Sequence, residues 1–230
     1  MNGSAPARRQ MTLLDALDEF RRYPSPWLLG VALLAAVIAR AVAGDWRITD
    51  AMVPIVMAAA FPFFEWMIHV VVLHWRPRSV AGLTVDPLLA RKHRDHHIDP
   101  RAVGLVFIPL QSLVGALVSS VAIAVWLFPR TGLGLSFLVV ILAFGLVYEW
   151  THYLVHTDYK PKGALYRAIW RNHRLHHFKN EHYWFAVTSP GTADRVLRTY
   201  PDPASVATSP TAKNLHAAAG TGKSVARESN

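Results

Sequence analysis

Four long apolar stretches dominate the chain and restrict what it can fold into. They span Trp27–Ala43, Ala51–Leu73, Ala102–Phe128 and Gly132–Val155. A helix crosses a bilayer with about 20 apolar residues, and these stretches are that long or nearly so. Hydrophobic residues make up 52% of the 230 residues and charged residues only 17%. The sequence predicts an all-α integral membrane protein with about four transmembrane helices. Pro109 and Gln111 predict that the first third of the third stretch is a separate re-entrant or surface piece.

The distribution of Lys and Arg predicts the orientation of these helices. Residues 1–26, 74–101 and 157–200 hold four, six and eight of them, whereas the opposite loops around Arg47 and Arg130 hold one each. Loops rich in Lys and Arg stay in the cytosol. Both termini and the segments that follow the second and fourth helices are therefore predicted to be cytosolic.

The two ends of the chain differ from its apolar middle. Residues 1–26 are predicted to form a cytosolic amphipathic segment on the membrane, because four apolar residues share one helical face. These residues are Leu13, Leu14, Leu17 and Phe20. Acidic residues interrupt the segment, so we expect no signal peptide. Residues 202–230 offer almost nothing to bury and are predicted to form a disordered tail. Residues 27–201 remain as one membrane domain.

Histidine is concentrated on the predicted cytosolic side. Of the 12 histidines, 11 lie between His69 and His182. Ten of them form two similar sets, each with a pair at the end of a predicted membrane helix and a His-x-x-His-His triad in the next segment. The first set is His69, His74, His93, His96 and His97, and the second is His152, His156, His173, His176 and His177. The chain therefore consists of two similar halves, and both predict a histidine-rich helical cap.

The spacing of these histidines follows the helical repeat with one exception. Residues at i, i+3 and i+4 share a face of an α-helix, so each triad is predicted to direct three rings the same way. His152 and His156, at i and i+4, also share a face. His69 and His74, at i and i+5, do not share a face of a regular helix. Either the helix is unwound or widened there, or the two bind different metals.

The chain has no cysteine, which limits its metal chemistry to nitrogen and oxygen ligands. The absence of cysteine excludes a disulfide framework, a thiolate haem, a cysteine-ligated iron–sulfur cluster and a thiol nucleophile. Imidazole suits zinc, copper, iron and nickel. Ten histidines exceed the ligands of one ion, so they predict two metal ions with about five nitrogens each. A structural zinc takes only four ligands, so a redox metal that meets a lipophilic substrate is favoured.

Other interpretations of the histidines remain. A single histidine at a membrane helix end is more often an interfacial or hydrogen-bonding residue than a ligand. His182 is either a further ligand or a surface residue, and His216 is interpreted as incidental within the tail. A metal transporter would place its ligands near the bilayer midplane, on broken helices. A bis-histidine haem protein would need fewer histidines, at more than one depth.

The order and spacing of the histidines resemble those of the integral-membrane fatty acid hydroxylase and sterol desaturase superfamily. That order is His-x4-His, His-x2-His-His, His-x3-His and His-x2-His-His. The fatty acid 2-hydroxylase branch is most similar, since its first motif also has four residues between its histidines. The segment His176–Pro190, "HHFKNEHYWFAVTSP", is also similar to this branch. The resemblance covers roughly Ala51 to Pro201.

This resemblance implies a membrane-bound non-haem di-iron oxygenase that hydroxylates a lipid acyl chain. Two iron ions, for which zinc could substitute, would use dioxygen and two external electrons. We expect no haem and no fused cytochrome b5 domain, so a separate protein would donate the electrons, and we expect no nucleic-acid partner. Sterol or carotenoid desaturation or hydroxylation remains an alternative within the superfamily.

Three carboxylates are candidates to orient the histidine rings. Glu65 and Glu149 lie one helical turn before His69 and His152, and Asp95 lies inside the first triad. Ligand histidines usually donate their second ring N–H to a carboxylate, carbonyl or water. We expect these three carboxylates to accept such hydrogen bonds, although each could instead form a salt bridge at the membrane surface.

Overall fold

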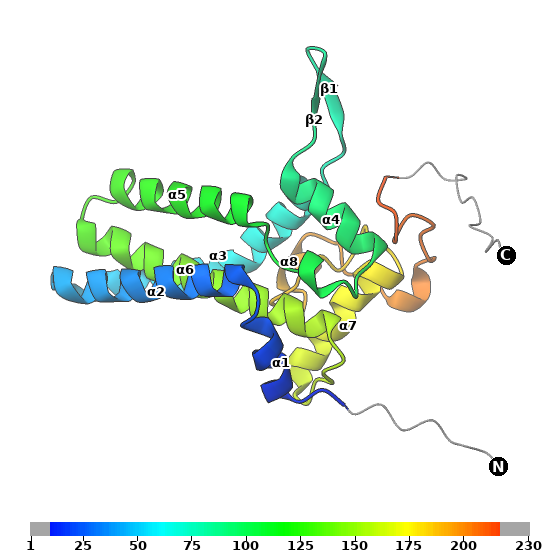
Figure 1. The fold of residues 1–230 in the computed structure, drawn as a ribbon, viewed down its shortest axis with the longest axis horizontal. Helices are drawn as coiled ribbons and strands as arrows, with labels where there is room; N and C mark the ends of the chain where they lie inside the picture. The colour runs from blue at the N-terminus through cyan, green and yellow to red at the C-terminus, as the bar shows by residue number, and fades with distance from the viewer. Residues whose placement is uncertain (1–9, 217–230) are drawn as a thin grey trace.

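The computed structural model describes residues 10–216, in which four long helices form an elongated bundle (Figure 1). The helices are α2 (Pro24–Ala43), α3 (Met52–Met67), α5 (Leu110–Trp126) and α6 (Thr131–His156). Within the described residues, four spans are long and apolar enough to cross a membrane. They are Pro24–Ala43, Ile48–Leu73, Val103–Trp126 and Thr131–His156, and they match the four predicted stretches. The predicted fold class, an all-α integral membrane protein with a histidine-rich cap, is confirmed.

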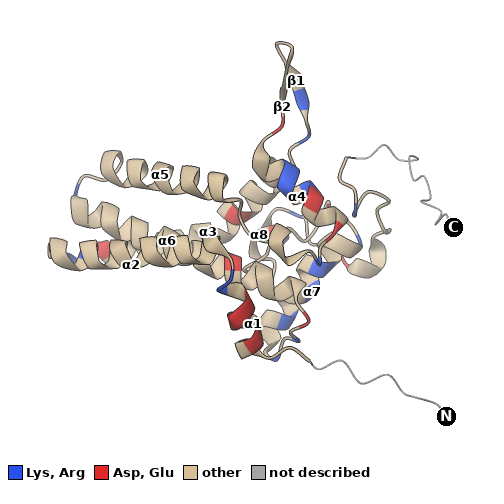
Figure 2. Ribbon diagram, in the orientation of Figure 1, with Lys and Arg blue, Asp and Glu red and all other residues tan. Residues whose placement is uncertain are grey.

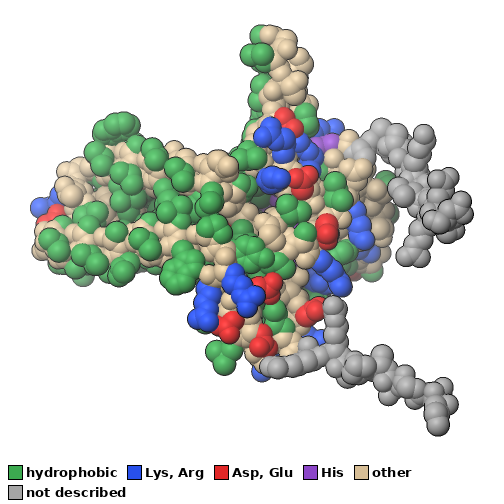
Figure 3. Space-filling model, viewed as in Figure 1, with side chains coloured by type: hydrophobic (Ala, Val, Ile, Leu, Met, Phe, Trp, Pro, Cys, Tyr) green, Lys and Arg blue, Asp and Glu red, His purple; other side chains and the backbone are tan. Residues whose placement is uncertain are grey.

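The bundle exposes apolar side chains along its length (Figure 3). Its interior contains a buried cluster of Leu29, Ala36, Leu113 and Leu142. At Gly134 in α6, a Cβ would lie 2.2 Å from the carbonyl oxygen of Ala124 in α5. Only glycine permits this close approach of the two helices. An apolar exterior around hydrogen-bonded helices is the arrangement that a lipid environment requires.

The third apolar stretch is divided, as predicted. A 3-10 turn, η3 (Val103–Leu105), comes first, and α5 begins only at Leu110. Pro109 is the N-cap residue of α5. Because proline has no backbone N–H and a fixed φ, it can stand just before a helix but not continue one from the preceding turn.

Ion pairs join the helices at the end of the bundle that lies far from the cap. Arg40 in α2 donates hydrogen bonds to Asp50 at 2.7 Å and to Asp45 at 3.2 Å. Arg130, just before α6, also pairs with both aspartates. Arg40 is 3% exposed, so its charge requires these partners. The network ties the loop between α2 and α3 to the start of α6. The loop between α2 and α3 contains the 3-10 turn η1 (Ile48–Ala51).

The cap lies at the other end of the bundle. Most of the charged residues lie in or beside it, and the ion-pair network lies at the far end (Figure 2). Its helices are α4 (Leu88–Ile98), α7 (Ala164–Phe178) and the short α8 (Thr192–Val196). An antiparallel hairpin of β1 (Arg78–Val80) and β2 (Leu83–Val85) projects from it. Ala81 and Gly82 join these strands with φ values of 51° and 79°. Two positive φ values are what a two-residue hairpin turn with the twist of the strands requires.

The N-terminal helix α1 (Leu13–Phe20) lies where the bundle meets the cap (Figure 1). Thr12 caps it, because its hydroxyl accepts from the Asp15 backbone N–H while the Asp15 carboxylate accepts from that of Thr12. Phe20 is buried against Phe107 and Tyr153, whereas Leu14 is 74% exposed. Leu13 and Leu17 are also exposed, and the placement of this helix on the membrane stays a prediction.

The prediction of a disordered tail from residue 202 is wrong for residues 202–216. A 3-10 turn, η4 (Pro203–Ser205), starts this segment, and Ala212 and Leu215 are buried. The Ser209 backbone N–H donates to the Lys179 carbonyl at 2.7 Å. Small and polar residues are held here through backbone and hydroxyl hydrogen bonds, which composition does not reveal. The rest of the predicted tail, residues 217–230, lies outside the described residues.

Candidate metal centre

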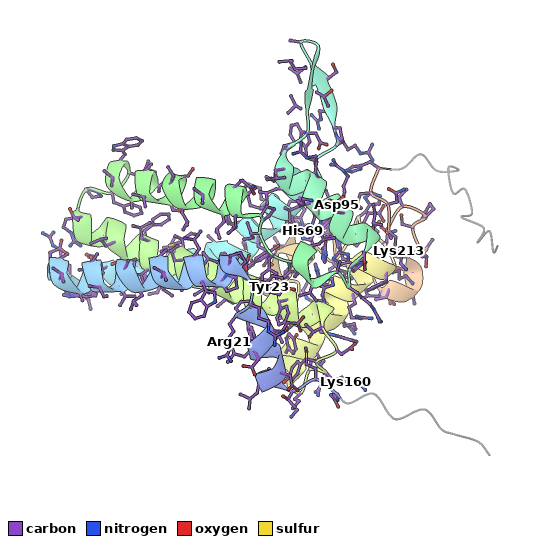
Figure 4. All side chains as sticks on the ribbon, viewed as in Figure 1. Arg21, Tyr23, His69, Asp95, Lys160 and Lys213 are labelled. Atoms are coloured by element: carbon purple, nitrogen blue, oxygen red, sulfur yellow. The ribbon has the colours of Figure 1, made fainter. Side chains whose placement is uncertain are left out.

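All ten predicted histidines meet where the bundle joins the cap, in two groups of five. The first group is His69, His74, His93, His97 and His176, and the second is His96, His152, His156, His173 and His177. Within each group, one ring nitrogen per residue lies within 4.8 Å of all the others. Nine of the rings are buried and His74 is half-buried. Figure 4 labels His69 at the inner end of α3, beside the cap.

Each group draws on both halves of the chain. The i and i+4 histidines of a triad join the pair from the preceding membrane helix, and the i+3 histidine crosses to the other group. His176 of the second triad therefore lies in the first group, and His96 of the first triad lies in the second group. The sequence predicted two metal ions with about five nitrogens each, but the spacing gave no indication of this exchange.

A π-helical turn brings His69 and His74 together. The turn η2 (Ile68–Leu73) continues α3, and the His74 backbone N–H donates to the His69 carbonyl at 3.1 Å. A π-helix has i to i+5 hydrogen bonds, so residues five apart lie one turn above each other. Their ring centroids are 5.1 Å apart. The widened helix, one of the two predicted alternatives, is confirmed.

Backbone carbonyls orient three rings of the first group. The Nδ1 atom of His69 donates to the Phe185 carbonyl at 2.6 Å, and that of His176 donates to the Tyr183 carbonyl at 2.8 Å. The Nδ1 atom of His97 donates to the Ala212 carbonyl at 2.8 Å. A neutral ring that donates from Nδ1 keeps a lone pair on Nε2, which then faces its neighbours. Every residue has a carbonyl, so no residue type could have signalled these contacts.

The free ring nitrogens fit metal ions. Nε2 of His69, His74 and His176 is buried without a hydrogen-bond partner among the described residues. Such unpaired buried groups are costly unless a ligand satisfies them. The Nε2 atoms of His93 and His97 are 3.2 Å apart, and those of His96 and His156 are 3.1 Å apart. Neighbouring ligands on an ion with bonds of about 2.0–2.1 Å are separated by roughly 3 Å.

Burial also keeps the cap histidines in the neutral form that binds metal. Desolvation lowers the pKa of His93, His96, His173, His176 and His177 well below the usual value. It lowers the pKa of His97 to about 4, against the opposing effects of the Ala212 carbonyl and Glu181. An ion needs no proton to leave such rings before it binds.

The predicted hydrogen bonds from histidine rings to Glu65, Asp95 and Glu149 are wrong, since the described residues give each carboxylate other partners. Glu65 accepts from the backbone N–H groups of Val187 and Thr188, at 2.7 and 2.9 Å. Glu65 and Glu149 satisfy buried backbone groups of distant segments, which local spacing does not reveal.

Glu149 accepts from the Ser25 hydroxyl and the Ile108 N–H. Asp95 lies on α4 and pairs with Lys92 at 3.2 Å, and its side chain is half exposed (Figure 4). Asp95 therefore matches the alternative interpretation, a salt bridge at the surface.

The two remaining histidines lie outside both groups. The His182 side chain is 63% exposed and lies 3.5 Å from Glu181, which is the surface position given as one alternative. His216 is close to the first group, because its Nε2 donates to the His74 carbonyl at 3.1 Å. The interpretation of His216 as incidental in a disordered tail is therefore corrected.

Two cavities reach the centre from different sides. An apolar cavity of about 300 Å³ lies between α3, α5 and α6, and its lining includes Phe64, Leu117, Tyr148 and His69. A polar cavity of about 500 Å³ opens at the cap, where Arg101 and His156 contribute to its lining. The first histidine group borders the apolar cavity and the second borders the polar one.

The fold and the site define an integral membrane protein with two histidine groups that could each hold a metal ion. The family model described as fatty acid hydroxylase matches residues 54–199. The dihydroceramide fatty acyl 2-hydroxylase of Arabidopsis thaliana is 27% identical over 175 residues, which cover 71% of this chain and 68% of that protein. The solved hydroxylase domain of Scs7p superposes with a TM-score of 0.64 and 22% identity, over 80% of this chain and 69% of that chain.

The chain belongs to the fatty acid hydroxylase family. The family resemblance predicted from the histidine spacing is thus confirmed, and the chain is an oxidoreductase of the hydroxylase type.

Proposed function

We propose that the chain hydroxylates a lipid acyl chain and that each histidine group holds one metal ion. The observation that carries this proposal is the pair of buried five-histidine groups beside an apolar cavity between membrane helices. Iron is the proposed metal of the active enzyme, and zinc can replace it because imidazole does not exclude zinc. When bound, iron in such a site supplies the redox chemistry by which dioxygen oxidises an unactivated C–H bond.

The apolar cavity is proposed to hold the acyl chain. Leu117 and Phe64 line it within the bundle, and His69 lies at its inner end. A chain that enters from the bilayer loses little on leaving lipid for this lining, so the cavity's contribution is to position a carbon and to exclude water. The lipid headgroup then stays near the junction of bundle and cap.

The reaction also requires dioxygen, two electrons and protons. One oxygen atom enters the product and the other is reduced to water, so a separate donor protein is proposed to supply the electrons. The basic surface of the cap suits an acidic redox protein. The Lys and Arg distribution supports a cytosolic metal centre and cytosolic termini. We propose residues 27–201 as the catalytic domain.

Lipid analysis of cells that express the chain tests the activity. Expression in the presence of isotopically labelled dioxygen should give a hydroxylated acyl lipid with one labelled oxygen atom, and His176→Ala should abolish it. His182→Ala is the matched control, because His182 is an exposed histidine of the same region, and it should retain the product. A desaturated product without label would overturn the hydroxylase assignment.

The orientation has its own test, which the absence of cysteine simplifies. Thr131→Cys and Gly163→Cys each introduce one thiol, at the start of α6 and before α7. A membrane-impermeant thiol reagent added outside intact cells should label the first variant and not the second. The reverse pattern would contradict a cytosolic cap.

A further inference from the structure

The C-terminal strap, defined here as residues 202–216, lies beyond the segment 54–199 that matches the family. It runs across the cap and buries Ala212 and Leu215, which are 3% and 4% exposed. The family match therefore does not account for what this segment does.

A buried glutamate anchors the strap. Glu181, which follows α7, is 2% exposed and accepts hydrogen bonds from the hydroxyls of Ser209 and Thr211. The Ser209 backbone N–H donates to the Lys179 carbonyl at 2.7 Å, and Asn180 donates to the Ala207 carbonyl at 3.3 Å. Hydrogen bonds to a charged acceptor are stronger than neutral ones, so these hydroxyls hold the strap in a defined place.

The anchored strap reaches the histidine rings directly. The Ala212 carbonyl accepts from Nδ1 of His97 at 2.8 Å, and both residues are buried. Because a carbonyl only accepts, this contact fixes His97 with its proton on Nδ1. Its Nε2 lone pair then faces Nε2 of His93, 3.2 Å away.

The contact is specific to one group. Within residues 10–216, the strap's hydrogen bonds to histidines reach His97 and His74, both of the first group. The other two carbonyls that orient rings of this group, from Tyr183 and Phe185, lie inside the family segment. One of three orienting carbonyls is thus supplied by the strap.

We propose that the strap completes the first metal site: the Ala212 carbonyl holds His97 in the tautomer and orientation that direct Nε2 at the ion. This inference rests on the proposed metal binding, and it extends the working domain past residue 201 to residue 216. His97 is the ligand, and the strap is a positioning element. The second site should not depend on it.

The test compares full-length variants that release the strap. Ser209→Ala/Thr211→Val removes both hydroxyls that bind Glu181, and Ala212→Trp places a large side chain at a buried position. Asn214→Ala, which changes an exposed residue of the same strap, is the control. Zinc stoichiometry and affinity are measured on purified, detergent-solubilised protein whose fold is checked by circular dichroism and size exclusion.

Wild type and Asn214→Ala should bind two ions per chain. The two strap variants should keep one ion unchanged and bind the other about 10- to 100-fold more weakly, the usual cost of losing a partner that orients a ligand. Adding either variant to His97→Ala should weaken binding no further, because the strap acts through His97. A general loss of fold would instead weaken both sites.

The outcomes separate the inference from the proposed function. Two unchanged ions in both strap variants would overturn the strap's role and leave the proposed function intact. A folded wild-type chain that binds no metal would overturn both.

Discussion

The two histidine groups share one plan but differ in their surroundings. Each combines a pair from a membrane helix, two histidines of the next triad and one histidine of the other triad. The first group needs a π-helical turn for its pair, whereas His152 and His156 lie in the regular helix α6. The first group also borders the apolar cavity and carries the C-terminal strap, and the second borders the polar cavity.

The two histidine groups therefore have similar ligand sets but different surroundings, and we expect them to differ in role. Under the proposed function, the first group faces the acyl chain and the second faces the cap. The i+3 histidines join the groups, because each triad helix supplies rings to both. A change in one triad helix should therefore affect the first or the second site according to which of its histidines is replaced.

The largest expected effect comes from paired alanine substitutions. His93→Ala/His176→Ala removes two ligands of the first group, so the chain should keep one metal ion. His173→Ala/His176→Ala removes one ligand from each group, so binding at both sites should weaken, although both changes lie in α7. Removing a residue that orients a ligand lowers metal affinity by up to roughly 100-fold. Removing the ligand itself should lower metal affinity by more than that.

Metal affinity and stoichiometry are measured for both pairs, with His182→Ala as the control. Hydroxylation should be abolished in both pairs. If the α7 pair affected only one ion and the pair from different helices affected two, the crossed arrangement would be contradicted.

The second prediction contrasts Glu65 with Glu149. Glu65→Ala leaves the N–H groups of Val187 and Thr188 unpaired, close to the Phe185 carbonyl that orients His69. It should lower activity and affinity at the first site by about 10- to 100-fold. Glu65→Gln should recover part of this loss, since an amide oxygen still accepts.

Glu149→Ala should have a smaller effect, because Glu149 accepts from one backbone N–H, that of Ile108, and from the Ser25 hydroxyl, whereas Glu65 accepts from two backbone N–H groups. We expect lower thermal stability with a smaller loss at either site. Asp95→Ala, at a half-exposed salt bridge, should change neither quantity measurably. An equal loss of metal for Glu65→Ala and Asp95→Ala would contradict the structural role of Glu65.

The third prediction concerns the apolar cavity, whose lining includes His69 of the first group. Ser112→Phe places a ring in its lining and should lower hydroxylation of long acyl chains by roughly 10-fold, since displacing a bound chain by about 1 Å misaligns the reacting carbon. Val118→Phe, on the exposed face of the same helix, is the control and should leave turnover unchanged. Metal content should stay constant in both, which separates this effect from ligand loss.

The smallest expected effect is the pH dependence of the metal-free protein. Burial lowers the pKa of His97 to about 4 and lowers the pKa values of His93 and His173 well below the usual value. The unfolded chain, with histidine pKa values near 6.5, then binds more protons than the folded chain. Stability is therefore full above about pH 6.5 and falls as the pH drops through and below that value.

Thermal unfolding between pH 7.5 and 5.5 checks this. Bound metal should oppose the fall, because it binds only neutral rings. A metal-free protein whose midpoint rises on acidification would contradict the burial of these rings.

The sequence by itself determined the membrane bundle, the division at Pro109 and the ten histidines of the centre. These features depend on local regularities: runs of apolar residues, a proline without N–H, and rings at i, i+3 and i+4. It also limited His69 and His74 to two possibilities, of which the π-helical turn was one.

Only the tertiary structure decided which histidines share a group and what holds them. The exchange of His96 and His176 depends on how α4 and α7 cross, and spacing along one helix carries no information on that. The orienting partners in the first group are carbonyls of Phe185, Tyr183 and Ala212, which any residue would supply. The contact of the strap with His97 joins residues 115 positions apart, and a long-range contact through backbone atoms leaves no local pattern in the sequence.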